Sequence, residues 1–264
     1  METSVYEQFY MVEKEHWWFA GMRTLCRAML KRLPIGNGDQ ETRCLDVGCG
    51  AGLWTQELGA FGQACGLDVA DEALQFCRRR GNNRLVRATA ERLPFKPDSY
   101  GLITAIGVIE HIGDEKGFLS ELARVCRPGG YVLFLTSAYD FLWSRHDEIV
   151  HHKRRYTKGQ FTQLLTSCGF QVVRSSYVNT FLFLPILIIR LGQRLSVGPA
   201  VLEKRSPDVF IPAPLVNKLL YWILWTETKI LNFVSFPFGV GLFAIARMPS
   251  GYEHMREGQP WQPS

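Results

Sequence analysis

The segment from Leu45 to Gly52 joins an apolar run to a glycine-rich turn, and this arrangement can bind a nucleotide-like ligand. Gly48, Gly50 and Gly52 let the backbone turn sharply and approach a ligand closely. The helix expected after the turn directs its free N–H groups toward the same place. A dinucleotide fingerprint requires Gly or Ala where this chain has Leu53, so the spacing argues against a nicotinamide dinucleotide.

A second chemically rich segment runs from Ser144 to Tyr156 and is dense in histidine, acid and arginine. His146 or His151 could act as a general base, because imidazole removes a proton from a hydroxyl near neutral pH. Lys153, Arg154 and Arg155 could instead clamp a phosphate or carboxylate. The segment therefore indicates contact with an acceptor molecule.

Two further interpretations of this segment stay open. His146, Asp147, His151 and His152 offer donor atoms for a metal, but loop spacing alone does not fix a coordination geometry, and we expect no metal. The charges could also form a solvated surface. Outside the segment, His111 is a third candidate base, with a packed histidine at a helix start as the alternative.

Alternating strands and helices must position these residues, because ligands of open parallel sheets bind beyond the carboxyl ends of the strands. Apolar runs predict strands, and apolar residues at helical spacing predict helices. The expected strands are 43–47, 64–68, 85–86, 102–106, 131–135, 170–177 and 240–247, and the expected helices are 53–60, 72–80, 115–125 and 157–169.

At this point the chain resembles a class I S-adenosylmethionine (SAM) dependent methyltransferase of the small-molecule, type 11-like group. Besides the glycine turn, four segments stand in the family's order: Gly66-Leu67-Asp68, Ala90 to Phe95, Leu102 to Ile112, and Glu121 to Gly130. The resemblance implies an α/β fold with a doubly wound, seven-stranded, mostly parallel sheet. It also implies an antiparallel last strand.

The resemblance further implies where the cofactor SAM binds. Asp68 would accept hydrogen bonds from the ribose diol, and Asp46 would lie near the methionyl amino group. Thr89 and Gly101 stand where the family often has acids, so adenine recognition would rely on the Thr89 hydroxyl and the Ala90 backbone. The expected cofactor residues are Asp46, Gly48, Cys49, Gly50, Gly52, Asp68, Val69, Thr89, Ala90, Glu91 and Ile106.

The chain divides on these grounds into five parts. Residues 1–35 form a helical lid, 36–178 the SAM-binding core, 179–238 an apolar helical insertion, 239–248 the last core strand and 249–264 a loose tail. The lid is rich in aromatic residues that could enclose an acceptor or simply anchor the helix to the core. The expected acceptor-binding residues are Trp17, Trp18, Arg23, Arg154, Arg155 and Tyr156.

The insertion is the main departure from a minimal methyltransferase. Its apolar runs, Phe181 to Ile189 and Leu215 to Val234, are too short or too interrupted by polar residues to span a membrane. They could lie on a bilayer, cover the acceptor site, form a homodimer interface or build a satellite core. The basic residues Arg190, Arg194, Lys204 and Arg205 would suit anionic lipid head groups.

Composition limits the other functions. A net charge of +5 without a basic tract argues against nucleic acid as a partner. Seven cysteines without a Cys-x-x-Cys pair indicate a reducing compartment, and no export signal is visible. We therefore expect a cytoplasmic protein, peripheral at the inner membrane surface if the insertion meets lipid.

The expected function is methyl transfer from SAM to a small, hydrophobic or lipid-linked acceptor, most readily at a hydroxyl. His146, His151 and His111 are the candidate catalytic residues. A non-catalytic SAM-binding partner protein is the alternative, because Thr89 and Gly101 replace acids of the family pattern. A nicotinamide-dependent oxidoreductase is the less favoured second alternative.

Overall fold

The computed structural model describes residues 3–35, 42–196 and 210–250 of the 264 in the chain, and within them seven strands form one sheet. Its strand order is β3-β2-β1-β4-β5-β7-β6. β7 runs antiparallel to both of its neighbours, and the other pairs are parallel, which confirms the expected sheet. The strands are β1 (Arg43–Val47), β2 (Gln63–Asp68), β3 (Leu85–Arg87), β4 (Tyr100–Ile106), β5 (Cys126–Ser137), β6 (Gln171–Val178) and β7 (Gly241–Arg247).

Alternate residues of the central strands face two separate hydrophobic cores. Ile103 and Phe134 join the core beneath α5 (Glu115–Val125) and α7 (Lys158–Ser167). Their neighbours Leu102 and Leu133 join the core beneath α2 (Trp17–Leu30), α3 (Leu53–Leu58) and α9 (Pro214–Leu231). Successive side chains of a strand point to opposite faces, so helices on both faces bury both sets.

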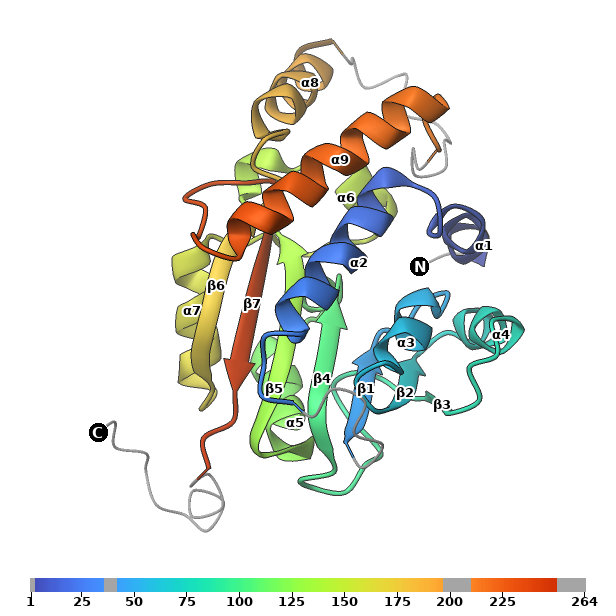
Figure 1. Cartoon of the computed structure of the whole chain (residues 1–264), viewed down its shortest axis with the longest axis vertical. Helices are drawn as coiled ribbons and strands as arrows, with labels where there is room; N and C mark the ends of the chain where they lie inside the picture. Colours follow the sequence, from blue (N-terminus) through green and yellow to red (C-terminus); the bar gives the residue numbers. More distant parts are fainter. Residues whose placement is uncertain (1–2, 36–41, 197–209, 251–264) are drawn as a thin grey trace.

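The end of the sheet toward which β4 and β5 point is covered by helices (Figure 1). They are α6 (Arg145–Ile149), α8 (Phe183–Ser196) and much of α9. Two short 3-10 helices, Ile109–His111 and Asp140–Leu142, follow β4 and β5 directly. The two other described helices, α1 (Thr3–Val12) and α4 (Asp71–Arg79), contact each other. Ligands of doubly wound sheets bind at the carboxyl end of the strands, so these elements surround the expected site.

The amino-terminal helices and the insertion, which are far apart in the sequence, form one layer. α2 and α9 lie side by side (Figure 1), and Gly21 permits this, because a Cβ there would lie 2.5 Å from Cδ1 of Leu224. The Trp17 N–H donates to Oδ1 of Asn217 at 2.9 Å, and Nδ2 of Asn217 donates to the Glu15 carbonyl at 2.8 Å. In the described part of the chain no helix is long and apolar enough to cross a membrane.

Candidate functional site

The glycine turn between β1 and α3 has one side open and one side packed. Gly48, Gly50 and Gly52 all adopt positive φ angles, of 69°, 53° and 86°. A Cβ on Gly52 would lie 2.6 Å from Sγ of Cys77, so this glycine lets α4 approach the turn. A Cβ on Gly50 would meet no atom within 4 Å. The open side of Gly50 is therefore where a ligand can reach the backbone.

Asp68 closes one side of this open space. Its Oδ2 accepts the Gly50 N–H at 3.0 Å, and its Oδ1 accepts the Ala70 N–H at 3.0 Å. The Tyr6 hydroxyl of α1 lies 3.5 Å from the same Oδ1. Burial raises the pKa of Asp68, against the effect of these donors. The carboxylate still has lone pairs for further donors, because two oxygens offer about four acceptor positions.

Asp46 is buried deeper, at the end of β1. Its Oδ2 accepts the Thr55 hydroxyl at 2.6 Å and its Oδ1 accepts the Thr104 hydroxyl at 2.9 Å. Burial raises its pKa to about 7. Asp46 therefore connects β1 to α3 and β4, and each of its oxygens already has a hydrogen-bond partner.

The other expected cofactor residues lie around the same edge. Val69, Thr89 and Glu91 are exposed, whereas Ala90 and Ile106 are half-buried and Cys49 is buried beside Cys77. Gly101 is explained by packing, since a Cβ there would lie 2.7 Å from Cζ of Arg127. An acid at position 101 would thus displace the Arg127 guanidinium.

A buried carboxylate, Asp147, organises the segment after β5. It accepts Nε of Arg155 at 2.8 Å, Nη2 of Arg155 at 3.0 Å, and both the N–H and hydroxyl of Ser144. Nδ1 of His152 lies 2.7 Å from its Oδ1. Burial alone would raise the pKa of Asp147, but His152 and the Arg155 guanidinium hold it well below its usual value.

Two more histidine rings lie beside His152, the histidine that contacts this carboxylate. The ring of His152 lies 4.7 Å from that of His111 and 6.2 Å from that of His146, measured between centroids. Burial and the neighbouring His152 lower the pKa of His111 to about 4. His146 is exposed, and so is His151, which sits on a turn with φ of 58°. The cluster therefore contains His111 and His146 of the expected bases and adds His152, which the sequence suggested only as a metal ligand.

The expected acceptor-binding residues do not converge on one place. Arg155 is buried against Asp147 and donates to the Ala138 carbonyl, so it is not free to clamp an anion as expected. Arg154 pairs with Glu115, which also accepts the Tyr156 hydroxyl at 2.5 Å. These contacts stabilise the segment itself.

The three expected residues of the lid are also engaged within the protein. Trp17 and Trp18 pack against the core on the α2 side of the sheet. Arg23 pairs with Glu57 at 3.0 Å. Among the described residues, no three His, Cys, Asp or Glu side chains are placed to hold a metal ion.

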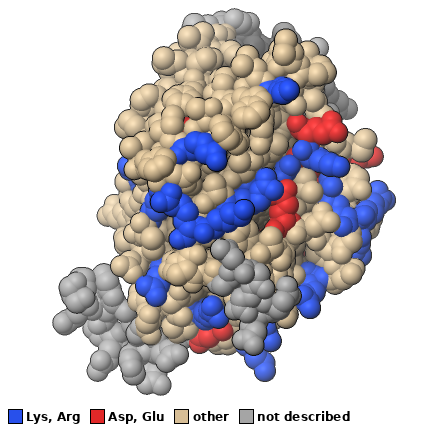
Figure 2. Space-filling view, viewed as in Figure 1, with Lys and Arg blue, Asp and Glu red and all other residues tan. Residues whose placement is uncertain are grey.

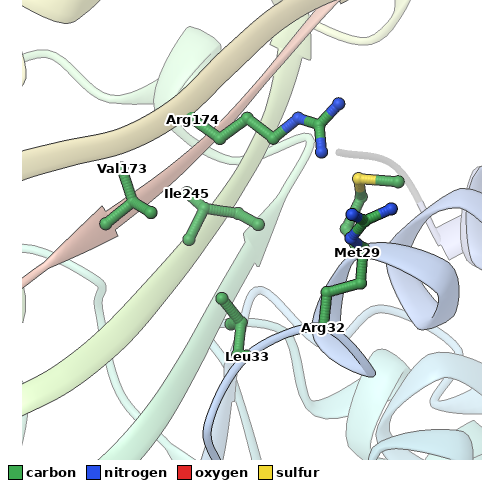
Figure 3. A pocket seen from close by; sticks show the side chains of 6 residues that line it. All are labelled: Met29, Arg32, Leu33, Val173, Arg174 and Ile245. Atoms are coloured by element: carbon green, nitrogen blue, oxygen red, sulfur yellow. The ribbon is translucent and has the colours of Figure 1, made fainter. Parts of the chain in front are cut away.

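A separate cavity of about 180 Å³ lies between α2 and the β6–β7 edge (Figure 3). Both arginines of its lining donate to backbone carbonyls at the end of α9. Arg32 donates to the Asn232 carbonyl at 2.9 Å, and Arg174 donates to the Leu231 carbonyl. The lining contains no residue of the glycine turn or of the histidine cluster. It is formed by Met29, Arg32, Leu33, Val173, Arg174 and Ile245.

Comparison with known proteins agrees with this geometry. Residues 45–134 match the model of the methyltransferase domain family. Over these residues the chain is similar to a methyltransferase domain. The ubiquinone biosynthesis O-methyltransferase of Bordetella bronchiseptica is 31% identical to this chain over 101 residues, which are 36% of this chain and 42% of that protein. The biotin biosynthesis bifunctional protein BioHC of Cellvibrio japonicus is 32% identical over 139 residues, 49% of this chain and 28% of that protein.

The match to the curated relatives thus spans less than half of their length. Among solved structures, a chain of the complex between the Haloferax volcanii Trm112 methyltransferase activator and its methyltransferase has a TM-score of 0.57, at 19% identity, over 93% of this chain and 97% of that one. Phosphoethanolamine N-methyltransferase 2 of Haemonchus contortus, solved with SAM, has a TM-score of 0.55 at 20% identity, over 84% and 52%. These structures confirm the class I methyltransferase fold.

Proposed function

We propose that this protein transfers a methyl group from SAM to a hydroxyl of a small hydrophobic or lipid-linked acceptor. Two features at the same edge of the sheet carry the proposal: the open turn at Gly50 and Asp68, and the hydrogen-bonded residues Asp147 and His152. The first suits the donor and the second suits removal of a proton from the acceptor. The match of residues 45–134 to the methyltransferase domain supports the donor.

The residues of the turn fit SAM. Asp68 would accept the ribose hydroxyls, the Gly48–Gly50 backbone would approach the methionyl part, and Val69, Thr89 and Ala90 would face the adenine. When bound, SAM supplies a methyl group on a positively charged sulfur, which is a good leaving group. The protein's own contribution is then alignment of the acceptor and removal of its proton.

His152 is the base that the geometry supports best. A carboxylate only accepts hydrogen bonds, so Nδ1 of His152 carries the proton that Asp147 binds, and Nε2 keeps its lone pair. We assign Nε2 to take the hydroxyl proton of the acceptor. His111, kept neutral by its lowered pKa, and the exposed His146 flank this ring. This proposal gives His151 no role, although it was an expected base. His151 lies on an exposed turn, and its ring is not part of the contacts that join His111, His146 and His152.

An aromatic wall beside this cluster supports a hydrophobic acceptor. The Tyr139 ring stacks between those of Phe141 and Tyr177, with centroids 4.9 Å away on each side. Phe183 of α8 adds an edge contact at 6.2 Å. Aromatic faces favour flat or apolar groups. O-methyltransferases of ubiquinone biosynthesis among the relatives support oxygen as the methylated atom.

Calorimetric titration with SAM and with its demethylated product tests the donor half. We expect micromolar binding by the wild type and at least about tenfold weaker binding by Asp68→Ala, which loses charged hydrogen bonds. Asp71→Ala is the matched control, because its carboxylate is exposed and pairs with Arg87 outside the turn. A folded wild-type protein that binds neither compound would refute the proposal and favour a protein that has lost the cofactor site.

Transfer of labelled methyl from SAM into a total lipid extract tests the acceptor half. We expect label in the organic phase with the wild type and loss of that label with His152→Gln, while calorimetric SAM affinity is kept. Label found only in water-soluble products would contradict a lipid-linked acceptor. Label transfer that His152→Gln does not slow would remove His152 as the base.

A further inference from the structure

The outward side of α9 is apolar along most of its length. Leu215, Leu219 and Trp222 recur at spacings of four and three residues, so they share one helix face, and their exposed fractions are 81%, 60% and 46%. The opposite side is packed on the protein, where Leu224 and Leu231 are buried. The helix therefore has two apolar sides, one packed on the core and one exposed.

α8 repeats this arrangement. Leu184, Ile188 and Leu191 have the same spacing and are all exposed, together with Ile189. Phe233, which follows α9, is also exposed. Exposed apolar stripes of this kind are costly in water and are typical of a contact site. In Figure 2 the end of the molecule formed by α8 and α9 is largely free of charged side chains.

The charges on this surface have one sign. Among the described residues between β6 and β7, the exposed charged side chains are Lys218 and Lys229, and both lie on the outward side of α9. The one described carboxylate there, Glu227, is buried and accepts the backbone N–H groups of residues 179–181. Within the described residues, this surface thus presents cations among apolar groups and no exposed acid.

The other cations that the sequence offered contribute less. Arg190 is turned toward the protein, where it donates to the Leu142 carbonyl. The side chain of residue 194 and the whole of residues 204 and 205 lie outside the described part. On α9, the rings of Trp222 and Trp225 are 5.0 Å apart, and Nζ of Lys229 lies 4.9 Å from the Trp225 centroid. Tryptophan beside lysine is typical of a membrane–water interface.

We infer that the outward face of α8 and α9 binds the surface of an anionic lipid bilayer, with both helices lying in the head-group layer. Apolar area buried among acyl chains and lysines near acidic head groups both favour this contact. A symmetric dimer through the same face is disfavoured, because a twofold interface would bring Lys218 and Lys229 toward an identical surface whose described residues include no exposed acid. Lipid phosphates supply the missing negative charge.

Docking in this way would bring the bilayer to the aromatic wall. Phe183 belongs to α8 and contacts both Tyr139 at 6.2 Å and Phe238 at 5.3 Å, so the outward face continues into the wall. A lipid-linked acceptor could then reach the histidine cluster without leaving the membrane surface. This consequence rests on the proposed function, whereas the docking itself does not.

Vesicle co-sedimentation of the full chain tests the inference, with phosphatidylcholine vesicles and with vesicles that also contain phosphatidylglycerol. We expect binding to the anionic vesicles and much weaker binding to the neutral ones. Lys218→Ala/Lys229→Ala should bind anionic vesicles about 30-fold more weakly, from roughly fivefold per lysine. Leu215→Ser/Leu219→Ser should lose binding to a similar extent, because it removes apolar area.

Two matched controls should bind as the wild type does. Lys96→Ala removes an exposed lysine before β4, and Val173→Ser removes an exposed apolar side chain from β6. Failure of the wild type to bind either vesicle, or equal losses in the controls, would overturn the inference. So would a wild-type dimer in ultracentrifugation that the two α9 variants convert to monomer.

Calorimetric SAM titration of the same variants separates this inference from the proposed function. Unchanged SAM affinity in the α9 variants would show that they are folded and that their loss of vesicle binding is local. Vesicle binding by a wild type that does not bind SAM would leave the docking surface standing and reject only the proposed function.

Discussion

The hydroxyl of Tyr6 lies 3.5 Å from Oδ1 of Asp68, so the first helix of the chain closes over the carboxylate proposed to bind the SAM ribose. The Tyr6 ring packs against Ala51, Ala73 and Phe76. Burial, with Asp68 as the next cause, raises the pKa of Tyr6, so its hydroxyl stays a donor at neutral pH. We therefore expect opening of α1 to uncover this carboxylate.

Two substitutions at Tyr6 should separate its ring from its hydroxyl. Tyr6→Ala removes buried aromatic area worth about 3 kcal/mol, so we expect the amides of α1 to exchange with solvent much faster. Tyr6→Phe keeps the ring and loses one long hydrogen bond, so exchange should change little. Hydrogen-exchange mass spectrometry of residues 3–12 measures this. Equal exchange in the two variants would contradict anchoring by the ring.

Arg80 should be the second anchor of α1. It donates to the Tyr10 and Ala51 carbonyls, at 2.8 and 3.0 Å, and pairs with Glu13 at 2.8 Å. Arg80→Ala leaves Glu13 without this cation, at a site where burial already raises the Glu13 pKa to about 7. We expect faster exchange of α1 and a loss of about 3 kcal/mol in the free energy of unfolding.

Arg78→Ala is the control for that experiment, because Arg78 lies on the same helix and is exposed. Urea denaturation of the two variants should place Arg78→Ala within about 0.5 kcal/mol of the wild type. A loss of stability in Arg78→Ala as large as that in Arg80→Ala would show that helix charge, and not the contact with α1, is responsible.

Asp147 should act as a positioning residue for His152. Asp147→Asn keeps the size of the side chain but removes the charge that Arg155 and His152 share, so a buried guanidinium loses its partner. We expect a loss of about 3 kcal/mol in the free energy of unfolding and strongly slowed methyl transfer, with SAM affinity unchanged. Denaturation, labelled transfer and calorimetry measure the three quantities. Glu148→Gln, at an exposed neighbouring position, should change none of them.

Glu227 should hold the insertion to the end of β6. Its carboxylate accepts the N–H of Thr180 at 2.7 Å and of Phe181 at 3.2 Å, and also that of Asn179. Glu227→Ala leaves two buried donors and one part-buried donor without this acceptor, so we expect a loss of about 3 kcal/mol. Thr226→Ala, exposed on the same helix, should cost about 0.5 kcal/mol or less in the same denaturation experiment.

The cofactor half of the fold could be predicted because its signals are local. The glycine turn and the acid at the end of β2 follow directly from short apolar runs with turn residues, and β1 has the expected bounds of Arg43 and Val47. The largest boundary error lies at β5. Pro128, Gly129 and Gly130 were expected to separate a helix from a strand at Tyr131, but β5 already begins at Cys126, where it pairs with Tyr100 before a register shift.

The contacts of the amino-terminal helices and of the histidine-rich segment could not be predicted, because they join residues far apart in the sequence or depend on how the segment packs. Tyr6 and Asp68 are 62 positions apart, and Trp17 and Asn217 are 200 apart. In the histidine-rich segment, composition does not tell which of two adjacent histidines turns inward. His152 does so because Asp147 is buried and needs donors, a requirement that appears only once α6 is packed.

His111 should make stability depend on pH in the mildly acidic range. Burial lowers its pKa from 6.5 to about 4 in the folded protein, whereas the unfolded chain takes up a proton near 6.5. As pH falls from 6.5 toward 4, the unfolded state binds a proton that the folded state does not, so stability is lost as pH falls. Between about pH 7 and pH 5 this loss should be about 2 kcal/mol.

Urea denaturation of the wild type and His111→Gln at both pH values measures that loss as a difference. Asp46 and Glu13, whose pKa values are raised to about 7, shift stability in the opposite direction, but equally in both proteins. His111→Gln should therefore lose less stability on acidification than the wild type does, and His151→Gln, at an exposed turn, should behave as the wild type. The same loss in His111→Gln and the wild type would mean that His111 is protonated as readily in the folded protein as in the unfolded chain.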